Sequence, residues 1–157
     1  MRRRMGRLPS VSGDCGSIRF SPARSLHYGH TVATGEVRLE VPAAPEFLRI
    51  SRIMAAGVAS RVGFTLDEVE DLRIAIDEVC FSMVGARGRV GTIALRYVLE
   101  DHQLSVEGTG RFSDGLGNDP VVSALSKQIL AAVVDECELS GGADGPQFRL
   151  VKRHRRS

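Results

Sequence analysis

Residues 66–86 read LDEVEDLRIAIDEVCFSMVGA and carry the clearest fold signal in the chain. Their apolar side chains recur every three or four residues, which is the spacing of one face of an amphipathic helix. Thr65 just before this stretch and Glu68 in its first turn match a capping box, which fixes where the helix begins. We therefore predict a helix that packs an apolar stripe against a core. The residues of that stripe are Val69, Leu72, Ile76, Val79 and Met83.

Two polar residues of the same helix share one face. Glu78 and Ser82 are four residues apart, so their side chains project from the same side. This arrangement is open to two interpretations, an ordinary solvated face or a polar site beside the apolar stripe. Asp77 is expected to pair with Arg73, one turn earlier on the helix surface.

The segments around this helix predict a sheet and two further helices. Pro45 suits the first turn of one helix, and alternating apolar residues mark the first strand. The segments in order are a strand at 36–41, a helix at 45–62, the helix at 66–86, strands at 92–99 and 104–107, a glycine-rich loop at 108–119, a helix at 121–134, and strands at 137–139 and 148–151. This order predicts an α+β two-layer sandwich, with a mixed or antiparallel sheet and three helices on one face.

Composition and charge indicate one domain with basic ends. The chain has 157 residues, of which 43% are hydrophobic and 25% charged, enough for a single core. Residues 1–34 are rich in arginine and lack helical or strand periodicity. We predict a disordered basic arm over 1–34, a folded domain over 35–152 and a basic tail over 153–157. The three cysteines are widely spaced without a CxxC pair, which indicates neither a disulfide framework nor a zinc site.

The sequence also bears on location and on nucleic acid. No run reaches the roughly twenty apolar residues that a membrane-spanning helix needs, and the arginine-rich start lacks the apolar part of a signal peptide. We therefore expect a cytoplasmic protein with no membrane partner. The basic ends suit contact with nucleic acid, but aromatic residues make up only 5% of the chain and Trp is absent. Direct nucleic-acid binding is the least favoured of the functions considered.

Three stretches, in this order, resemble one family. They are VPAAPEFLRISRIMAAGVASRVGF at 41–64, DLRIAIDEVCFSMVGA at 71–86 and LAAVVDECELSGG at 130–142. Together with the order of elements, they resemble the RsbW-like anti-sigma factor serine kinases of the GHKL ATPase group, whose domain is the Bergerat fold. The resemblance covers residues 36–151 and implies that fold.

The resemblance implies roles for two residues of the central helix. In the family this helix is similar to E-A-x-x-N, in which the glutamate is the general base and the asparagine helps to hold the magnesium of ATP. By this resemblance Glu78 is the catalytic base. Ser82 stands at the metal and cofactor position, with a hydroxyl in place of the amide oxygen.

Two more family signatures fall on altered stretches. D-x-G-x-G is similar in position to 107–111, where Glu107 replaces the adenine-binding aspartate, or where a one-residue slip retains Gly108 and Gly110. The lid signature G-x-G-L is similar in position to 124–127, with both glycines replaced. The resemblance therefore adds Ser126 and Lys127 as candidate cofactor contacts, although the default interpretation of Lys127 is a solvated lysine in the first turns of a helix.

The resemblance implies a regulatory protein that sequesters an RNA polymerase sigma factor and is controlled by a STAS-type anti-anti-sigma factor. Side chains in place of lid glycines obstruct the approach of backbone N–H groups to phosphates, so we expect a weakened or lost site for ATP and magnesium. The alternative is an active ATP-dependent serine kinase that phosphorylates the anti-anti-sigma factor. A homodimer is implied by the resemblance alone.

Overall fold

The computed structural model describes residues 35–155. The predicted arm over 1–34 and the last two residues of the predicted tail lie outside the described residues. The elements are β1 (Gly35–Pro42), α1 (Pro45–Val62), α2 (Leu66–Val84), β2 (Gly91–Glu100), β3 (Gln103–Phe112), α3 (Ala124–Val133), β4 (Glu136–Gly142) and β5 (Gly145–Arg153). The strands form one sheet in the order β1-β2-β3-β5-β4, and every pairing is antiparallel. The predicted α+β architecture is confirmed.

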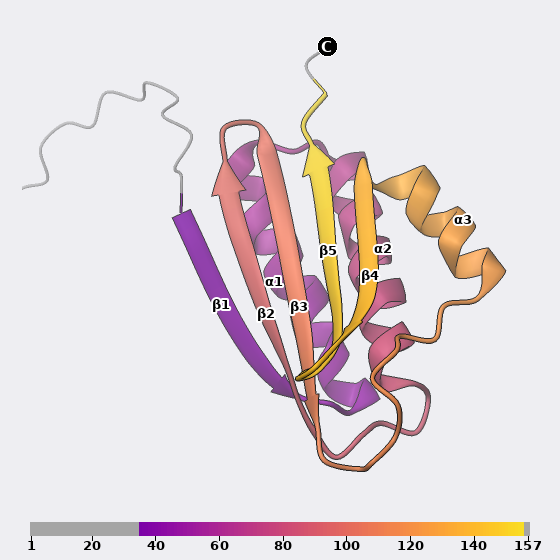
Figure 1. Ribbon diagram of the computed structural model, residues 1–157. Helices are drawn as coiled ribbons and strands as arrows, with labels where there is room; N and C mark the ends of the chain where they lie inside the picture. The colour runs from indigo at the N-terminus through magenta and orange to yellow at the C-terminus, as the bar shows by residue number, and fades with distance from the viewer. Residues whose placement is uncertain (1–34, 156–157) are drawn as a thin grey trace, which may run out of the picture. The chain divides into compact units, whose positions relative to one another are not determined.

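The helices lie on one side of this sheet. Helices α1 and α2 cover one face, and α3 lies along α2 beyond the edge strand β4 (Figure 1). The core between the layers contains fully buried side chains from both, such as Leu72 and Ile76 of α2 and Ile93 and Val106 of the sheet. No helix in the described part of the chain is long and apolar enough to cross a membrane.

Helix α2 begins as the sequence predicts. The Thr65 Oγ1 atom accepts a hydrogen bond from the backbone N–H of Glu68 at 3.3 Å. A Glu68 carboxylate oxygen accepts from the backbone N–H of Thr65 at 2.8 Å, which completes the capping box. The helix ends at Val84, because Gly85 takes a positive φ of 68°.

The predicted pair between Asp77 and Arg73 is wrong. Asp77 Oδ2 lies 2.7 Å from Arg52 Nη1 of α1, and Arg73 pairs instead with Glu70 on its own helix. Burial raises the pKa of the Asp77 carboxyl, and Arg52 acts against that increase. The pair joins α1 to α2, a tertiary contact that helical spacing alone does not reveal.

The predicted glycine-rich loop starts later than expected. Residues 108–112 belong to β3, where they pair with β2, and Gly108 and Thr109 also pair with β5. Glycine has a low intrinsic preference for strands, but pairing on both sides outweighs it. The irregular connection therefore begins at Ser113.

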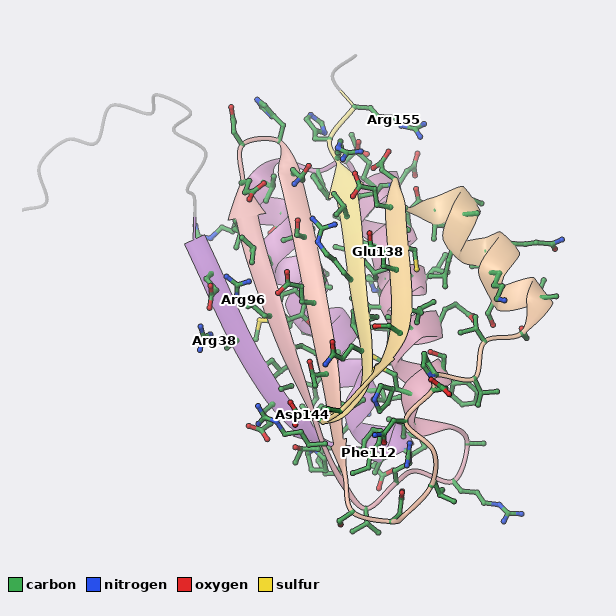
Figure 2. All side chains as sticks on the ribbon, in the orientation of Figure 1. Arg38, Arg96, Phe112, Glu138, Asp144 and Arg155 are labelled. Atoms are coloured by element: carbon green, nitrogen blue, oxygen red, sulfur yellow. The ribbon has the colours of Figure 1, made fainter. Side chains whose placement is uncertain are left out.

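The end of the folded domain also differs from the predicted boundary at 152. Arg153 is part of β5, and the next two residues return to the start of α2. His154 Nδ1 lies 2.9 Å from one Glu68 carboxylate oxygen, and the backbone N–H of Arg155 donates to the other at 2.8 Å. Arg155 is visible beyond the end of β5 in Figure 2. Part of the predicted tail is therefore built into the domain.

A chain that starts at Thr34 is expected to fold as the full chain does. All eight described elements begin at or after Gly35, so the truncation removes none of the hydrogen bonds within residues 35–155. Far-UV circular dichroism and a thermal melt of both proteins measure this. A clear drop in the melting midpoint would contradict a domain boundary at residue 35.

Candidate functional site

The face of α2 that carries Glu78 and Ser82 points toward α3. The Ser82 carbonyl accepts a hydrogen bond from the backbone N–H of Val121, just before α3, at 2.9 Å. Near the other end, Lys152 Nζ of β5 donates to Asp71 Oδ2 at 2.8 Å and to the Val133 carbonyl at 2.7 Å. Helix α3 therefore runs antiparallel to α2, along the stripe on which Asp71, Glu78 and Ser82 lie.

Ser82 is buried beside a cavity. Its residue is 9% exposed, and its hydroxyl donates to the Val79 carbonyl of the preceding turn at 2.7 Å. The cavity has a volume of about 490 Å³. It is lined by Ser82, the end of α2, the turn at 85–89 and part of the loop at 116–121. The hydroxyl proton thus already has a partner within the helix.

Glu78 lies one turn earlier and is half-buried. Among residues 35–155 its carboxylate takes part in no hydrogen bond or ion pair. It does not line the cavity that Ser82 lines. The two residues share a helix face, as predicted, but not a cavity.

Glu107 lies on the opposite face of the sheet. Strand alternation directs Val106, Gly108 and Gly110 of β3 toward the helices and Glu107 toward the open face. There Arg96 Nη1 lies 2.9 Å from Glu107 Oε2, and its other terminal nitrogen, Nη2, lies 2.7 Å from Glu36 Oε2. Arg96 is labelled in Figure 2. The sheet itself separates Glu107 from Ser82.

The helix side of Gly108 and Gly110 is filled by side chains of the chain itself. A Cβ atom on Gly108 would lie 2.1 Å from Phe148 Cε1, and one on Gly110 would lie 2.5 Å from Phe112 Cζ and 3.2 Å from Met83 Cε. Phe112 lies at the end of β3 that leads into the loop (Figure 2). No room for a further ring remains directly above these two glycines.

Ser126 and Lys127 lie in the first turn of α3. The backbone N–H of Ser126 donates to the Ser123 hydroxyl at 2.9 Å, and that of Lys127 donates to the Ser123 carbonyl at 3.1 Å. Both amides are therefore used in starting the helix. The Lys127 side chain lines a second cavity of about 540 Å³, between α3 and β4, together with Cys137 and Leu139. Lys127 and Ser82 thus face different cavities.

Comparison with known proteins gives relatives for this arrangement, although no protein-family model matches the chain. Serine-protein kinase RsbW of Bacillus pumilus is 36% identical over 75 residues, which cover 45% of this chain and 46% of that protein. The RsbW of Bacillus subtilis is 38% identical over 73 residues, with the same two shares. A solved structure of the RsbU and RsbW domains of Rv1364c from Mycobacterium tuberculosis matches 76% of this chain and 32% of that chain, with a TM-score of 0.58 and 19% identity. The chain is RsbW-like.

The extent of the likeness is limited. This chain spans about half the length of the curated relatives it matches, with 46% of each covered. The likeness to the solved structure shows the fold alone, because the identity is 19%. For this RsbW-like chain, the roles of Glu78, Ser82 and the other candidate residues therefore stay predictions.

No sequence pattern points to Arg89 as a functional residue of this RsbW-like domain. Its side chain is only 8% exposed, and Nη2 lies 2.6 Å from Asp114 Oδ1, on a carboxylate that is 14% exposed. The hydrogen bond from Arg89 holds the pKa of Asp114 well below its usual range. The guanidinium carbon also lies 4.1 Å from the centroid of the Phe112 ring. Arg89 bonds partners 25 to 28 residues away, so no local spacing signals its role.

Taken together, the candidate nucleotide residues of this RsbW-like domain do not surround one space. Ser82 faces the cavity at the end of α2, Glu107 faces the open side of the sheet, and Lys127 faces the cavity between α3 and β4. Within residues 35–155 no group of three His, Cys, Asp or Glu side chains is arranged to hold a metal ion. As placed in this structure, the candidate residues do not line one common cavity, and binding of ATP and magnesium stays a prediction.

Proposed function

We propose that this chain is an anti-sigma factor-like regulatory protein, which binds and sequesters an RNA polymerase sigma factor without using ATP. A STAS-type anti-anti-sigma factor would control its release. The observation that carries this proposal is the filled space above Gly108 and Gly110, where Phe148, Phe112 and Met83 pack. Partner binding needs the fold and its surface, which this packing stabilises, whereas phosphoryl transfer needs an open site for the donor.

The second candidate is an active serine kinase acting on the anti-anti-sigma factor. Two observations favour it: the curated relatives are named serine-protein kinases, and Glu78 is half-buried with no partner among the described residues. A free carboxylate at that position suits a general base. This candidate requires ATP and magnesium to bind, and that requirement separates the two candidates.

Titration of the protein with ATP and magnesium in a calorimeter is expected to give no binding stronger than about 1 mM. Ser82→Asn is expected to leave this result unchanged, because the carbonyl of residue 82 bonds Val121 and the space above the motif glycines stays filled. Tight magnesium-dependent binding by the unaltered protein would favour the kinase. A gain in affinity only in Ser82→Asn would mean that the pocket survives.

Co-purification from the native host tests the partner. A sigma factor is expected in the complex both with and without added nucleotide. Recovery that depends on nucleotide would contradict sequestration without ATP, and recovery of neither a sigma factor nor an anti-anti-sigma factor would overturn the proposed function itself.

A further inference from the structure

The loop between β3 and α3 forms part of the wall of the cavity beside Ser82 and is fixed at both ends. At its start, the backbone N–H of Ser113 donates to the Val90 carbonyl at 2.9 Å. At its end, the backbone N–H of Val121 donates to the Ser82 carbonyl at 2.9 Å. Between them, Leu116 and Gly117 line the cavity. The loop has no regular secondary structure, so these contacts decide its position.

Arg89 holds the middle of this loop. Its guanidinium donates to both carboxylate oxygens of Asp114, at 2.8 and 2.6 Å, which is a bidentate ion pair. The same group donates to the Gly117 carbonyl at 3.0 Å and to the Leu116 carbonyl at 3.2 Å. Asp114 in turn accepts from the backbone N–H of Leu116 at 3.0 Å. The buried Arg89 guanidinium therefore donates hydrogen bonds to three residues of the loop, Asp114, Leu116 and Gly117.

Arg89 is itself held in place by a backbone hydrogen bond and by an aromatic ring. Its backbone N–H donates to the Ala43 carbonyl at 2.8 Å, in the connection between β1 and α1. Its guanidinium rests on the Phe112 ring, which covers Gly110. Arg89 has a hydrogen-bonded backbone and a planar guanidinium with several donors, so it fixes the geometry of the loop better than a flexible surface lysine would. The contact between Arg89 and Phe112 therefore links the position of the loop to the side chains that fill the space above Gly110.

We propose that Arg89 is an internal latch, which holds the loop 113–123 in place as one wall of the cavity beside Ser82 without any ligand. The consequence for partner binding rests on the proposed function: the surface that binds a partner is then preformed and does not change when nucleotide is added. The latch itself is a property of Arg89, Asp114 and the loop backbone. It can therefore be tested separately from any partner.

Amide hydrogen exchange of the full chain tests the latch. Arg89→Ala is expected to speed exchange at the Val121 amide by about tenfold or more, because loss of the latch frees a bond that Arg89 does not itself make. Arg87→Ala is the matched control: Arg87 is exposed, lines the same cavity and has no hydrogen bond or ion pair within the described residues, so exchange should not change. In the unaltered protein, added ATP and magnesium should leave exchange at Val121 unchanged.

Asp114→Asn is a second variant that tests the latch if Arg89→Ala fails to fold. It removes the charge partner but keeps an oxygen that can accept from Leu116, and it should speed Val121 exchange while the amide of Val106 in β3 stays protected. Unchanged Val121 exchange in both variants would overturn the latch. So would a marked slowing of that exchange by nucleotide in the unaltered protein. Neither result depends on whether a sigma factor binds, so a failed latch and a failed partner proposal are distinguishable.

Discussion

Gly145→Ala is expected to destabilise the domain by about 3 kcal/mol or more. Gly145 starts β5 with a φ of 139°, a region that residues with side chains rarely adopt. A Cβ atom there would lie 1.9 Å from the Gly110 carbonyl oxygen of β3. Backbone cannot move aside as a side chain can, so the turn before β5 or the end of β3 must shift.

Urea denaturation of the two proteins measures this loss. The matched control is Gly57→Ala in α1, where an added Cβ atom meets nothing within 4 Å. That substitution is expected to stabilise the domain by about 0.5–1 kcal/mol, because glycine is unfavourable inside a helix. Equal midpoints for Gly145→Ala and the unaltered protein would mean that β3 and the turn at 145 do not approach this closely in solution.

Glu68→Gln is expected to cost about 3 kcal/mol at neutral pH and to remove a pH dependence. Burial alone raises the pKa of Glu68, but hydrogen bonds from the Arg155 backbone, the His154 ring and Thr65 outweigh burial and lower the pKa from 4.5 to about 2. A lowered pKa in the folded state stabilises the protein above the unfolded pKa. That stabilisation is fully present above about pH 5 and disappears as the pH falls from 4.5 toward 2.

The two proteins should therefore differ most in unfolding free energy at neutral pH and converge near pH 2 to 3. Glu70→Gln is the control, since Glu70 is exposed and, within residues 35–155, pairs only with Arg73 three residues later, a contact of about 0.5 kcal/mol or less. Denaturation series at several pH values provide the comparison. A difference that does not shrink on acidification would refute the assignment of this titration to Glu68.

Periodicity and capping predicted the central helix well, because both are local. The stripe from Leu72 to Met83 and the cap at Thr65 follow from spacing within a few residues. The strand conformation of residues 108–112 was not predicted, because glycine has a low strand preference. Only pairing with β2 and β5 outweighs that low preference. The alternation of β3 then decides which residues face the helices, and it places Glu107 on the open face.

Two features around the site depend on long-range contacts that no sequence spacing encodes. Lys152 belongs to a basic run in the sequence, yet it is 5% exposed and bonds Asp71, which lies 81 residues earlier. Arg89 looks like an ordinary turn residue between glycines, and its carboxylate partner lies 25 residues later. Sequence similarity located the candidate positions, but only tertiary packing determines whether they meet around one space.

The placement of β5 between β3 and β4 has a consequence for biosynthesis. Strand β4 is made before β5, but within the described sheet it pairs with β5 alone. On the ribosome, β4 therefore has no pairing strand until residues 145–153 have emerged. The partners of Glu68 are also made late, because His154 and Arg155 follow it by 86 and 87 residues. A nascent chain that stalls before this point exposes an unpaired edge of β3 and the apolar side of β4, which makes stalled chains targets for chaperones and proteases.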